Sequence, residues 1–570
     1  MTEITPDLWM KSWDPHVKST LEYPTESLGV LYTRAMAKFP NKPACWMMNR
    51  EITYGELLVQ VRKFASFLQQ NGVNKGDVVT ICLPNCPQSL IAHFGTLLIG
   101  AIASGLNPLL SENECAYQLR NSRSKVIVTM DVIYDKRLKK MLEVLPSLKL
   151  IIATNISEFM GLNKIAIFIG KLIGKIPKGK VDDWPGMKVV KFSKIMKNTS
   201  IDLKNVTIDV NKDLALLQYT GGTTGSPKGA ELTHSNFIAM HVQFTHWCDF
   251  KDGEEIALSA FPTFHIGGLI VATQAVWIAS SQILIPNPRD TDHFIKQLIE
   301  KKPTILGNVP TLYGMVMNNP KSKDIPQEVL DNVTTYVSAA APFPAEMIRD
   351  FEKHMKAENK VMELYGMTET TTNISNPFYG KKKVGKIGLP LPDTSVRIVD
   401  IESGEDLGTG EPGEILIKGP SIFRGYFKDQ EATERVIKDG WIHTGDVGIM
   451  DEDGYIQIVD RIKDMLIISG YKVFSVHVED ILTKHPDIEL AAVVGVDDPN
   501  RPGSQLVKAY VKLKKGVKPT YDVEEDIKHY AIENLSKYEK PTLWVFKEEL
   551  PLSIVGKVLK RALREEEVSK

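Results

Sequence analysis

The sequence has few cysteines and almost no net charge, and each scarcity excludes a class of protein. Five cysteines among 570 residues are an odd number and too few for a disulfide framework. Cys82 and Cys86 lie four residues apart, but no second Cys or His pair stands at zinc-binding spacing. A net charge of −1 provides no basic surface for nucleic acid. We therefore expect free thiols in a reducing compartment and no nucleic-acid partner.

Signals for export or membrane insertion are scarce as well. Residues 1–7 carry acids and lack the basic start and apolar core of a signal peptide. The apolar run 89–106 approaches the length of a membrane span, but His93 and three glycines interrupt it, and no charge cluster follows. We interpret this run as a helix buried between two layers of an α/β domain. The sequence therefore indicates a cytoplasmic protein.

The chain is long enough for at least two domains, and its hydrophobic pattern alternates helices with strands. A chain of 570 residues exceeds the size at which a single core stops growing. Residues 53–71 have the periodicity of an amphipathic helix. The strand-like segments around it are 78–83, 125–129 and 150–154. This βαβ alternation predicts a doubly wound parallel sheet.

A second series of the same kind follows, and then the pattern changes. The strands expected in this second series are 255–259, 282–285, 304–307 and 335–338. After Gly388 the chain has short strands joined by tight turns, with a hairpin signal at 451–454. A linker at 460–464 precedes a final α+β unit. Its expected elements are a helix at 475–485, strands at 490–496 and 505–513, and a helix at 521–535.

The segment 156–180 interleaves apolar residues with lysines and has hardly any acid. One interpretation is a helical insertion that packs on its own domain with its lysines in solvent, and we favour it. The other is an amphipathic segment that touches a membrane surface and aids the uptake of a lipid substrate. Peripheral membrane contact is therefore kept as the second hypothesis.

A glycine-rich string follows the buried strand at 214–217. Its residues after Tyr219 are Thr220, Gly221, Gly222, Thr223, Thr224, Gly225, Ser226, Pro227 and Lys228. Glycines let backbone N–H groups approach an anion, and the hydroxyls and one ammonium add donors and charge. The string lacks the Gly-Lys-Ser/Thr ending of a Walker loop, and a flexible linker is the alternative. We expect a loop that closes on the phosphates of a nucleotide.

Four further motifs follow in order. The first two are Ser338, Ala339, Ala340 and Ala341, then Glu363, Leu364, Tyr365, Gly366, Met367, Thr368 and Glu369. The others are the Gly-Asp pair that ends in Asp446, with Arg461 beyond it, and the run 551–561 around Lys557. With the loop, these strings resemble the motifs of the adenylate-forming (AMP-binding) superfamily. The resemblance covers almost the whole chain and is greatest for long-chain fatty acyl-CoA synthetases.

The resemblance implies a fold and a division of the chain. The fold is α/β, with a large N-terminal domain of two doubly wound sheets and a small distorted β-barrel, followed by a small mobile α+β C-terminal domain. The expected boundaries are 1–460, divided near 1–212, 213–376 and 377–460, and 461–570, with a hinge at 460–464.

The resemblance also implies roles for the motif residues. The loop binds ATP, Thr220 and Glu369 attend Mg²⁺, Tyr365 stacks on adenine, and Ser338 to Ala341 leave room for that base. Asp446 accepts hydrogen bonds from the ribose, with Arg461 beside it. Lys557 reaches between the substrate carboxylate and the α-phosphate. Lys463 occupies the hinge, and Gly470, Tyr471 and Lys472 line the path of CoA. Lys560 and Arg561 are expected as solvated surface charges.

The acid to be activated is inferred from the string 261–269, which occupies the acyl-pocket position. His265 stands where amino-acid-activating relatives place an Asp, which disfavours an amino acid. Gly267, Gly268 and Leu269 suggest room for an apolar chain. The expected reaction makes acyl-AMP and then acyl-CoA from a fatty, long-chain acid. Medium-chain or aryl acids, an acyl-AMP ligase that serves a carrier protein, a non-enzymatic nucleotide sensor and a homodimer remain open.

Overall fold

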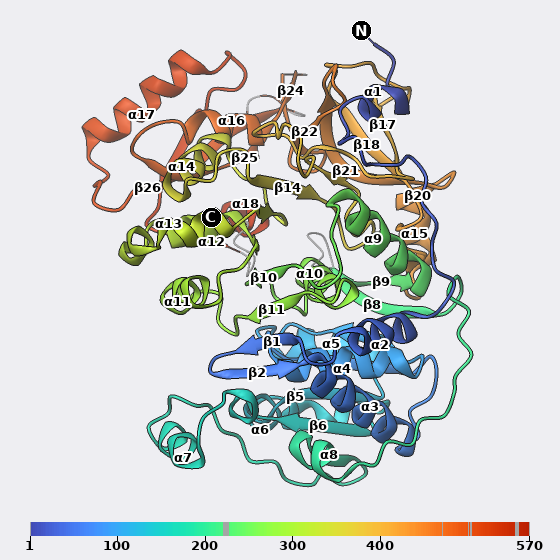
Figure 1. Ribbon diagram of the computed structural model, residues 1–570. Coiled ribbons are helices and arrows are strands. Elements are labelled where there is room, and N and C mark those ends of the chain that lie inside the picture. Colours follow the sequence, from blue (N-terminus) through green and yellow to red (C-terminus); the bar gives the residue numbers. More distant parts are fainter. Residues whose placement is uncertain are drawn as a thin grey trace.

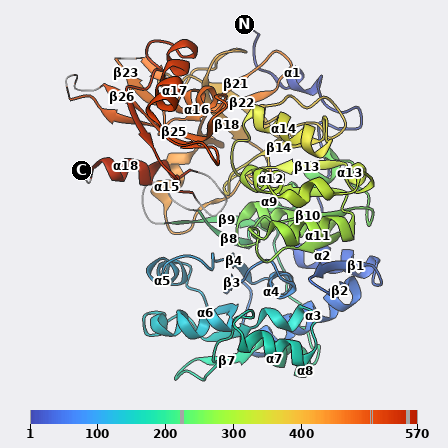
Figure 2. The same ribbon diagram turned by 90° about the vertical axis from the view of Figure 1, so that its left-hand side faces the viewer.

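The structure, a computed structural model, describes residues 2–220, 227–469, 471–499, 501, 504–552 and 558–568. Figure 1 shows two α/β layers stacked one above the other, with a β-rich part and a further α+β unit beyond the second layer. Figure 2, turned by 90°, shows the same order of layers. The expected α/β class is therefore confirmed. The predicted Gly221–Ser226 part of the phosphate loop, Gly470 and Lys557 lie outside the described residues.

The first sheet has eight strands, which pair in parallel except at one edge. From one edge to the other they are β19 (Gly425–Tyr426), β9 (Lys228–Thr233), β8 (Leu214–Thr220), β4 (Ile102–Gly105), β3 (Val78–Cys82), β5 (Val126–Met130), β6 (Leu150–Thr154) and β7 (Lys188–Lys191). At that edge β9 pairs antiparallel with both β8 and β19. The three strands predicted around the helix at 53–71 are all present.

The second sheet has nine strands and is parallel from β1 to β14. Its order is β16 (Leu389–Pro390), β15 (Ile374–Ser375), β14 (Val361–Tyr365), β13 (Thr335–Ser338), β12 (Ile305–Asn308), β10 (Ile256–Ser259), β11 (Ser281–Leu284), β1 (Pro43–Met47) and β2 (Arg50–Thr53). All four strands predicted for this sheet are present.

The two sheets exchange strands across the boundary expected near residue 212. Strands β1 and β2 precede that point but extend the second sheet, whereas β8 and β9 follow it and complete the first. The cause is pairing between segments that are distant in the sequence: Cys45 and Trp46 of β1 pair in parallel with β11, and β8 pairs with β4. Each sheet therefore draws strands from both sides of residue 212, which corrects the division at that point.

A common core joins the two sheets through five helices. They are α2 (Leu28–Lys38), α3 (Tyr54–Gln70), α4 (Pro87–Leu98), α9 (His234–Trp247) and α10 (Ile266–Trp277), and all contribute to one cluster of buried residues. Helix α3 is the helix predicted at 53–71. A capping box begins it, in which Thr53 accepts from the Glu56 backbone N–H and the Glu56 carboxylate accepts from that of Thr53.

The apolar run 89–106 is a helix, a turn and a strand, not the single helix expected. Helix α4 ends at Leu98, Gly100 adopts a left-handed φ of 70°, and β4 begins at Ile102. The helical part is buried, as predicted. Among the described residues, every helix is too short or too polar to traverse a bilayer.

The remaining helices cover the sheets and their edges. They are α1 (Pro6–Met10), α5 (Glu112–Asn121), α6 (Asp131–Lys136), η1 (Leu138–Val144), η2 (Ile156–Phe159), α7 (Lys164–Leu172), α8 (Phe192–Asn198), α11 (Thr291–Lys301), α12 (Pro310–Met317), η3 (Pro320–Asp324), α13 (Gln327–Asn332), α14 (Ala345–Met355) and α15 (Gln430–Val436).

The segment 156–180 is helical at η2 and α7, and its two ends pack on the domain as we favoured, since Phe159 and Ile176 are buried. Helix α7 between them does not follow this expectation. No residue of α7 is buried, and four of its large apolar side chains are exposed: Ile165, Phe168, Ile169 and Leu172. Full burial of one such side chain contributes about 1.5–3 kcal/mol. The helix therefore leaves a sizeable stabilisation unused on its outer face.

The β-rich part is a five-stranded antiparallel sheet. Its strands are β17 (Ser395–Val399), β18 (Gly413–Lys418), β20 (Ile437–Lys438), β21 (Trp441–Met450) and β22 (Ile456–Arg461). The predicted hairpin joins β21 to β22, where Gly454 has a φ of 84°. A Cβ on Gly454 would lie 2.5 Å from Trp9, so glycine is needed there for packing as well.

The C-terminal unit begins beyond β22 and has its own core. Its elements are β23 (Leu466–Ile468), β24 (Tyr471–Val473), α16 (Ser475–Leu482), β25 (Ile488–Asp497), β26 (Gln505–Leu513), α17 (Tyr521–Asn534), β27 (Leu543–Phe546) and α18 (Lys560–Val568). The two helices and two strands predicted for it are present. The expected hinge, 460–464, connects β22 to β23.

Candidate active site

The glycine-rich string is flanked by the two strands of a β-hairpin. Strands β8 and β9 pair antiparallel up to Thr220 and Lys228, which stand opposite each other. The Thr220 hydroxyl donates to the Lys228 carbonyl at 3.5 Å. Residues 221–226 connect the two strands and lie outside the described part. The sequence thus folds so that the first and last residues of the predicted phosphate loop are adjacent.

Tyr426 connects this hairpin to Glu369. It lies on β19, which pairs with β9 at Ala230. The Lys228 Nζ lies 5.1 Å from the centroid of the Tyr426 ring, a cation–π contact. The Tyr426 hydroxyl donates to Glu369 Oε1 at 2.6 Å. The sequence does not indicate Tyr426 as a site residue, because its link to the motifs is made by a two-residue strand with no sequence signal.

Glu369 is a buried carboxyl, with 7% of its surface exposed. Burial raises its pKa, while the hydrogen bond from Tyr426 and the charge of Arg461 act in the opposite direction. The Thr220 hydroxyl and the Glu369 carboxylate are hard oxygen donors of the kind that Mg²⁺ accepts. No group of three or more His, Cys, Asp or Glu that could hold a metal is found among the described residues. The donor set fits an ion that takes its other ligands from water and phosphate.

A glycine is needed where the chain turns from β14 toward Glu369. A Cβ on Gly366 would lie 1.6 Å from the Thr371 carbonyl oxygen, so no other residue fits there without moving the backbone. The Met367 backbone N–H donates to the Thr370 hydroxyl at 2.9 Å and closes the turn. This turn holds Tyr365 and Glu369 in fixed positions relative to each other.

Asp446 is held by two side chains from other motifs. The Tyr365 hydroxyl donates to Asp446 Oδ2 at 2.7 Å, and Arg461 Nε lies 2.9 Å from Asp446 Oδ1. Asp446 and Arg461 are also opposite each other on β21 and β22. Burial and the nearby Asp446 charge raise the pKa of Tyr365 well above its ordinary value, so its hydroxyl remains a donor. Three residues predicted to contact the nucleoside thus form one cluster.

The carboxyl ends of β12, β13 and β14 place three polar residues in one row. Ser338 stands opposite Asn308 on one side and Glu363 on the other. The Ser338 Oγ and the Asn308 Nδ2 are buried without a hydrogen-bond partner among the described residues. In open α/β sheets ligands bind beyond the carboxyl ends of the strands. Asn308 is a second site candidate that the sequence analysis missed.

Glu363 and the alanines after Ser338 shape the same strand ends. Burial raises the pKa of Glu363 to about 8, against the effect of a hydrogen bond from the Gly385 backbone. Ala340 has a φ of 70°, which turns the chain sharply after β13. Ala339, Ala340 and Ala341 are partly or fully exposed, so small side chains border open space there.

His265 lies at the N-terminal end of α10, next to the base of the hairpin. Gln218, two residues before Thr220, donates to the Phe264 carbonyl at 2.7 Å and ties the two segments together. Burial lowers the pKa of His265, which keeps its imidazole neutral near pH 7. Gly267 has open space where a Cβ would stand. Gly268 does not, because its Cβ would lie 2.1 Å from the Pro262 carbonyl oxygen. The expectation that Gly268 leaves room for an acyl chain is therefore wrong.

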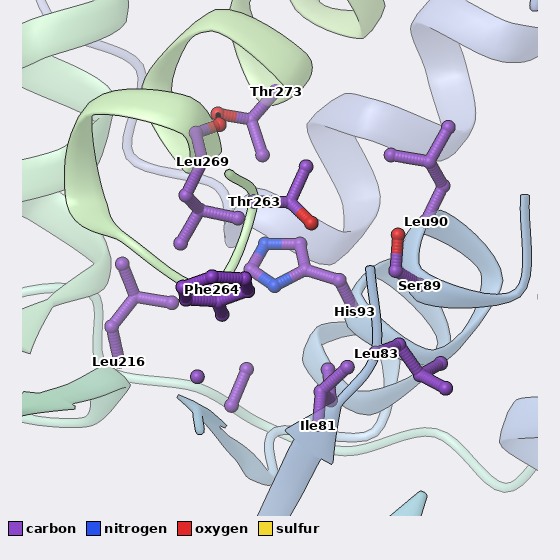
Figure 3. A pocket seen from close by; sticks show the side chains of 12 residues that line it. Ile81, Leu83, Ser89, Leu90, His93, Leu216, Thr263, Phe264, Leu269 and Thr273 are labelled. Atoms are coloured by element: carbon purple, nitrogen blue, oxygen red, sulfur yellow. Dashed lines mark hydrogen bonds between the residues drawn. The ribbon is translucent and has the colours of Figure 1, made fainter. Parts of the chain in front are cut away.

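A cavity lies behind this loop (Figure 3). Its lining is mostly apolar, with His93 among the few polar groups: Ile81, Leu83, Ser89, Leu90, His93, Ala103, Gly105, Leu216, Thr263, Phe264, Leu269 and Thr273. Figure 3 shows the His93 ring between Phe264 and Thr263. Burial lowers the pKa of His93 to about 3, and its Nε2 has no hydrogen-bond partner among the described residues. A neutral, apolar space thus adjoins His265.

The C-terminal unit meets the N-terminal part near these groups. Lys472 Nζ lies 3.0 Å from Glu402 Oε1, which joins β24 to the loop after β17. The charge of Asp480, on α16, adds to the raised pKa of Glu363. Tyr471 stacks on Tyr538 with ring centroids 4.0 Å apart and is 55% exposed. Two of the residues expected along the CoA path thus lie at or near the surface of this unit.

Lys560 is not the solvated charge that we expected. Its Nζ lies 2.7 Å from Glu479 Oε1 and donates to Ser475 Oγ at 2.7 Å, and its side chain is 13% exposed. Ser475 Oγ in turn donates to Asp460 Oδ1 at 2.9 Å, so the first hinge residue joins the network. The residue type alone did not indicate this buried partner. Arg561, in contrast, is exposed as expected and pairs with Glu565 along α18.

Comparisons with known proteins show to which families and relatives the chain is similar. The AMP-binding enzyme model matches residues 32–427, and the AMP-binding enzyme C-terminal domain model matches residues 477–557. A long-chain-fatty-acid–CoA ligase of Bacillus subtilis is 36% identical over 565 residues, 98% of each chain. A 4-coumarate–CoA ligase-like protein of Oryza sativa is 29% identical and spans 91% of this chain and 88% of the relative. ATP-bound MatB of Rhodopseudomonas palustris superposes with a TM-score of 0.80, at 26% identity, over 95% of this chain and 99% of that one.

Proposed function

We propose, from the membership of this chain in the AMP-binding enzyme family, that it is an AMP-forming acid–thiol ligase. Its reaction converts a long-chain fatty acid to the CoA thioester. The observation that carries the proposal is the 36% identity to a long-chain-fatty-acid–CoA ligase over 98% of both chains. The clusters around Glu369 and Asp446 support it, because Tyr365, the last residue of β14, donates to Asp446, and Glu369 follows in the turn after the same strand and accepts from Tyr426.

In the first half-reaction, a carboxylate oxygen of the acid attacks the α-phosphorus of ATP, and pyrophosphate leaves. The product is an acyl-adenylate, and no side chain has to act as a nucleophile. Catalysis then consists of positioning and charge neutralisation. We assign phosphate binding to Thr220, Lys228 and residues 221–226, and ribose binding to Asp446 and Arg461. Lys557 neutralises the oxygens at the reacting centre.

Mg²⁺ would be held by Thr220 and Glu369 and would neutralise charge on the phosphate oxygens. For this purpose Glu369 has to be ionised. Tyr426 favours that state, since its hydroxyl donates to the Glu369 carboxylate at 2.6 Å and works against the rise in pKa that burial causes.

In the second half-reaction, the thiol sulfur of CoA attacks the acyl carbonyl carbon, and AMP leaves with the mixed-anhydride oxygen. The sulfur loses its proton, and the C–S bond replaces the C–O bond. We propose that the unit after residue 460 rotates about Lys463 between the two steps. The segment Gly470 to Lys472 then faces the pantetheine arm.

The acyl chain is assigned to the space beside His265. The neutral imidazole, the open position at Gly267 and the apolar cavity behind Phe264 together favour an uncharged tail over an amino acid. An aryl acid is the second candidate for this space, because a 4-coumarate–CoA ligase-like protein is 29% identical over 91% of the chain.

The test is ATP–pyrophosphate exchange with a series of acids from acetate to oleate and with coumarate as the aryl control. We expect exchange that depends on the added acid and is fastest with long chains. Exchange that is fastest with coumarate would replace the fatty acid by an aryl acid, and no exchange with any acid would refute the ligase assignment. Thioester formation with free CoA then separates a CoA ligase from an acyl-AMP ligase that serves a carrier protein.

A further inference from the structure

Helix α7 (Lys164–Leu172) carries an apolar stripe that faces solvent. Five large side chains on it are between 48% and 72% exposed: Ile165, Phe168, Ile169, Leu172 and Ile173. Their spacing of three, one, three and one residues places them on one face of an α-helix. In an ordinary surface helix such a face packs on the core. Here it is the outer face, and we call these five residues the outer stripe.

The outer stripe is held in place from both ends. Before the helix, a Cβ on Gly161 would lie 2.9 Å from the backbone of Asn49, so the chain passes close to the turn between β1 and β2. After it, the Asn155 side-chain amide donates to the Pro177 carbonyl at 2.8 Å. Ile176 is 5% exposed and packs under Gly170, whose Cβ would lie 2.7 Å from it. The inner side is thus anchored, and this fixes which face points outward.

The helix itself is well formed. The Asn163 side chain accepts from the Ala166 backbone N–H at 2.8 Å, which caps its first turn. A nine-residue helix with no buried residue is marginal in water by itself. The cap and the anchored ends therefore maintain a stripe that contributes little to folding.

Positive charge borders one side of the outer stripe. Residues 156–180 contain five lysines and one acid, Glu158. Lys164 and Lys171 are seven residues apart, two helical turns, and flank the same side of the stripe. Within the described part of the chain, no acidic residue lies at ion-pair distance from Lys164, Lys171, Lys175 or Lys178, whereas Lys180 pairs with Asp182 at 3.1 Å. An apolar face beside unpaired lysines complements an anionic lipid surface.

The position of α7 in the molecule suits such a contact. Figures 1 and 2 show it at the end opposite to the C-terminal unit, at the periphery of the first α/β layer. A flat surface against this end would leave α16, α17 and the strands around them free. We propose that the outer stripe and its flanking lysines dock this protein on the surface of an anionic bilayer, with the apolar side chains in the interfacial region. The docking does not rest on the proposed function.

The test is binding of the full-length protein to large unilamellar vesicles. We compare phosphatidylcholine vesicles with vesicles that contain about a third phosphatidylglycerol. The wild type should bind the anionic vesicles, and the triple variant Ile165→Ser, Phe168→Ser, Leu172→Ser should bind them at least about tenfold more weakly. The matched control is Leu109→Ser with Ile532→Ser, two side chains that are 73% and 55% exposed on other elements. This control should bind as the wild type does.

The lysines give an independent measurement. Lys164→Gln with Lys171→Gln should weaken binding to anionic vesicles by about fivefold per lysine and leave the weak binding to neutral vesicles unchanged. Lys296→Gln, on α11, is the control for charge. In addition, Phe168→Trp should show a blue-shifted emission with anionic vesicles, because its indole then leaves water.

Three results would overturn the proposal. The first is equal vesicle binding by the wild type and the triple serine variant. The second is no vesicle binding by the wild type. The third is a wild-type dimer that the triple variant converts to a monomer in size-exclusion chromatography with light scattering, since the stripe would then be covered by a second copy. Vesicle binding and acid-dependent pyrophosphate exchange are measured independently. A failure of the docking proposal is therefore distinguishable from a failure of the proposed function.

Discussion

Tyr426 links the two residues that we assign to the metal and the phosphates. Its hydroxyl donates to Glu369 Oε1, and its ring lies under the Lys228 ammonium. Removal of the hydroxyl would leave a buried carboxyl without its donor, at a cost of about 1–3 kcal/mol. Since this hydrogen bond lowers the pKa of Glu369 against the effect of burial, its loss should raise that pKa further.

We therefore expect Tyr426→Phe to reduce kcat/KM for adenylate formation by about tenfold. The acid limb of the pH–rate profile should move to higher pH, because Glu369 then has to lose its proton at a higher pH. Pyrophosphate exchange from pH 5 to 9 measures both effects. Tyr379→Phe, which removes the hydroxyl of a tyrosine that is 61% exposed, is the control. A lower rate with an unmoved acid limb would show that Tyr426 acts only through packing.

Glu363 makes stability depend on pH in a direction opposite to that of most carboxyls. Burial raises its pKa to about 8, whereas the unfolded chain releases the proton near the ordinary value of 4.5. Between these values the folded state binds more protons than the unfolded state, so its contribution to stability falls as pH rises from about 4.5 to about 8. Above about 8 the loss is complete and the contribution no longer changes.

Glu363→Gln should remove that dependence. Relative to the wild type, the variant should gain stability as pH rises through this window, by an amount on the order of 5 kcal/mol at pH 9. Urea unfolding at several pH values measures it, with Glu402→Gln as the exposed control. If the free energies of unfolding of wild type and variant changed with pH in parallel, Glu363 would have to be ionised in the folded protein well below pH 8.

The motif residues could be predicted from the sequence because their side-chain chemistry is specific and their order is informative. The structure brings Tyr365, Asp446 and Arg461 together and joins Lys228 to Glu369 through Tyr426. Asn308 and Tyr426 could not be predicted, since strand pairing alone brings them to the site. The partner of Lys560 was missed for the same reason: Glu479 lies on another element, and the sequence shows two ordinary charges.

Helix α10 offers a test of the acyl path. Leu269 is 7% exposed and borders the cavity behind Phe264, whereas the next residue, Ile270, packs in the core and is absent from that lining. Leu269→Trp should fill the cavity and reduce kcat/KM for palmitate by about tenfold while octanoate loses much less. Ile270→Trp overpacks the same helix without entering the cavity and should show no dependence on chain length. An equal loss for all acids with Leu269→Trp would place the acyl tail elsewhere.

Most helices and strands could be predicted because their periodicity is local. The predictions were wrong where contacts with another part of the chain decide the structure. The run 89–106 is apolar in both its helix and its strand, so periodicity could not locate the turn at Gly100. The sheets exchange β1, β2, β8 and β9 across residue 212, which depends on pairing between distant segments. Helix α7 was placed correctly, but a sequence cannot show which side of an amphipathic helix meets the core.

In the whole molecule, two contacts relate the C-terminal unit to the nucleotide groups. Lys472 pairs with Glu402 at 3.0 Å, and the charge of Asp480 acts on Glu363. The ion pair is on the surface, where Glu402 is 77% exposed, and such pairs contribute about 0–1 kcal/mol. So weak a contact would not prevent rotation about the hinge. The buried network of Lys560, Glu479 and Ser475 holds α18 to α16, which would let the unit move as one body. Ser475 also donates to Asp460, before the hinge, through its hydroxyl and its backbone N–H, so a rotation about Lys463 has to move or break these two bonds.

This arrangement predicts that the two half-reactions can be separated by one substitution. We assign Lys557 to the reacting centre of the first step only. Lys557→Ala should therefore lower acid-dependent pyrophosphate exchange by at least about a thousandfold. This is the range for the loss of a group that stabilises charge in the transition state. Thioester formation from synthetic acyl-AMP and CoA should change less than about threefold, because the hinge rotation removes that residue from the centre before the thiol attacks. Lys518→Ala, an exposed lysine of the same unit, is the control and should retain both activities. If both steps fell together in Lys557→Ala while the control and the unfolding curve stayed normal, one domain orientation would have to serve both reactions, and the rotation about Lys463 would be excluded.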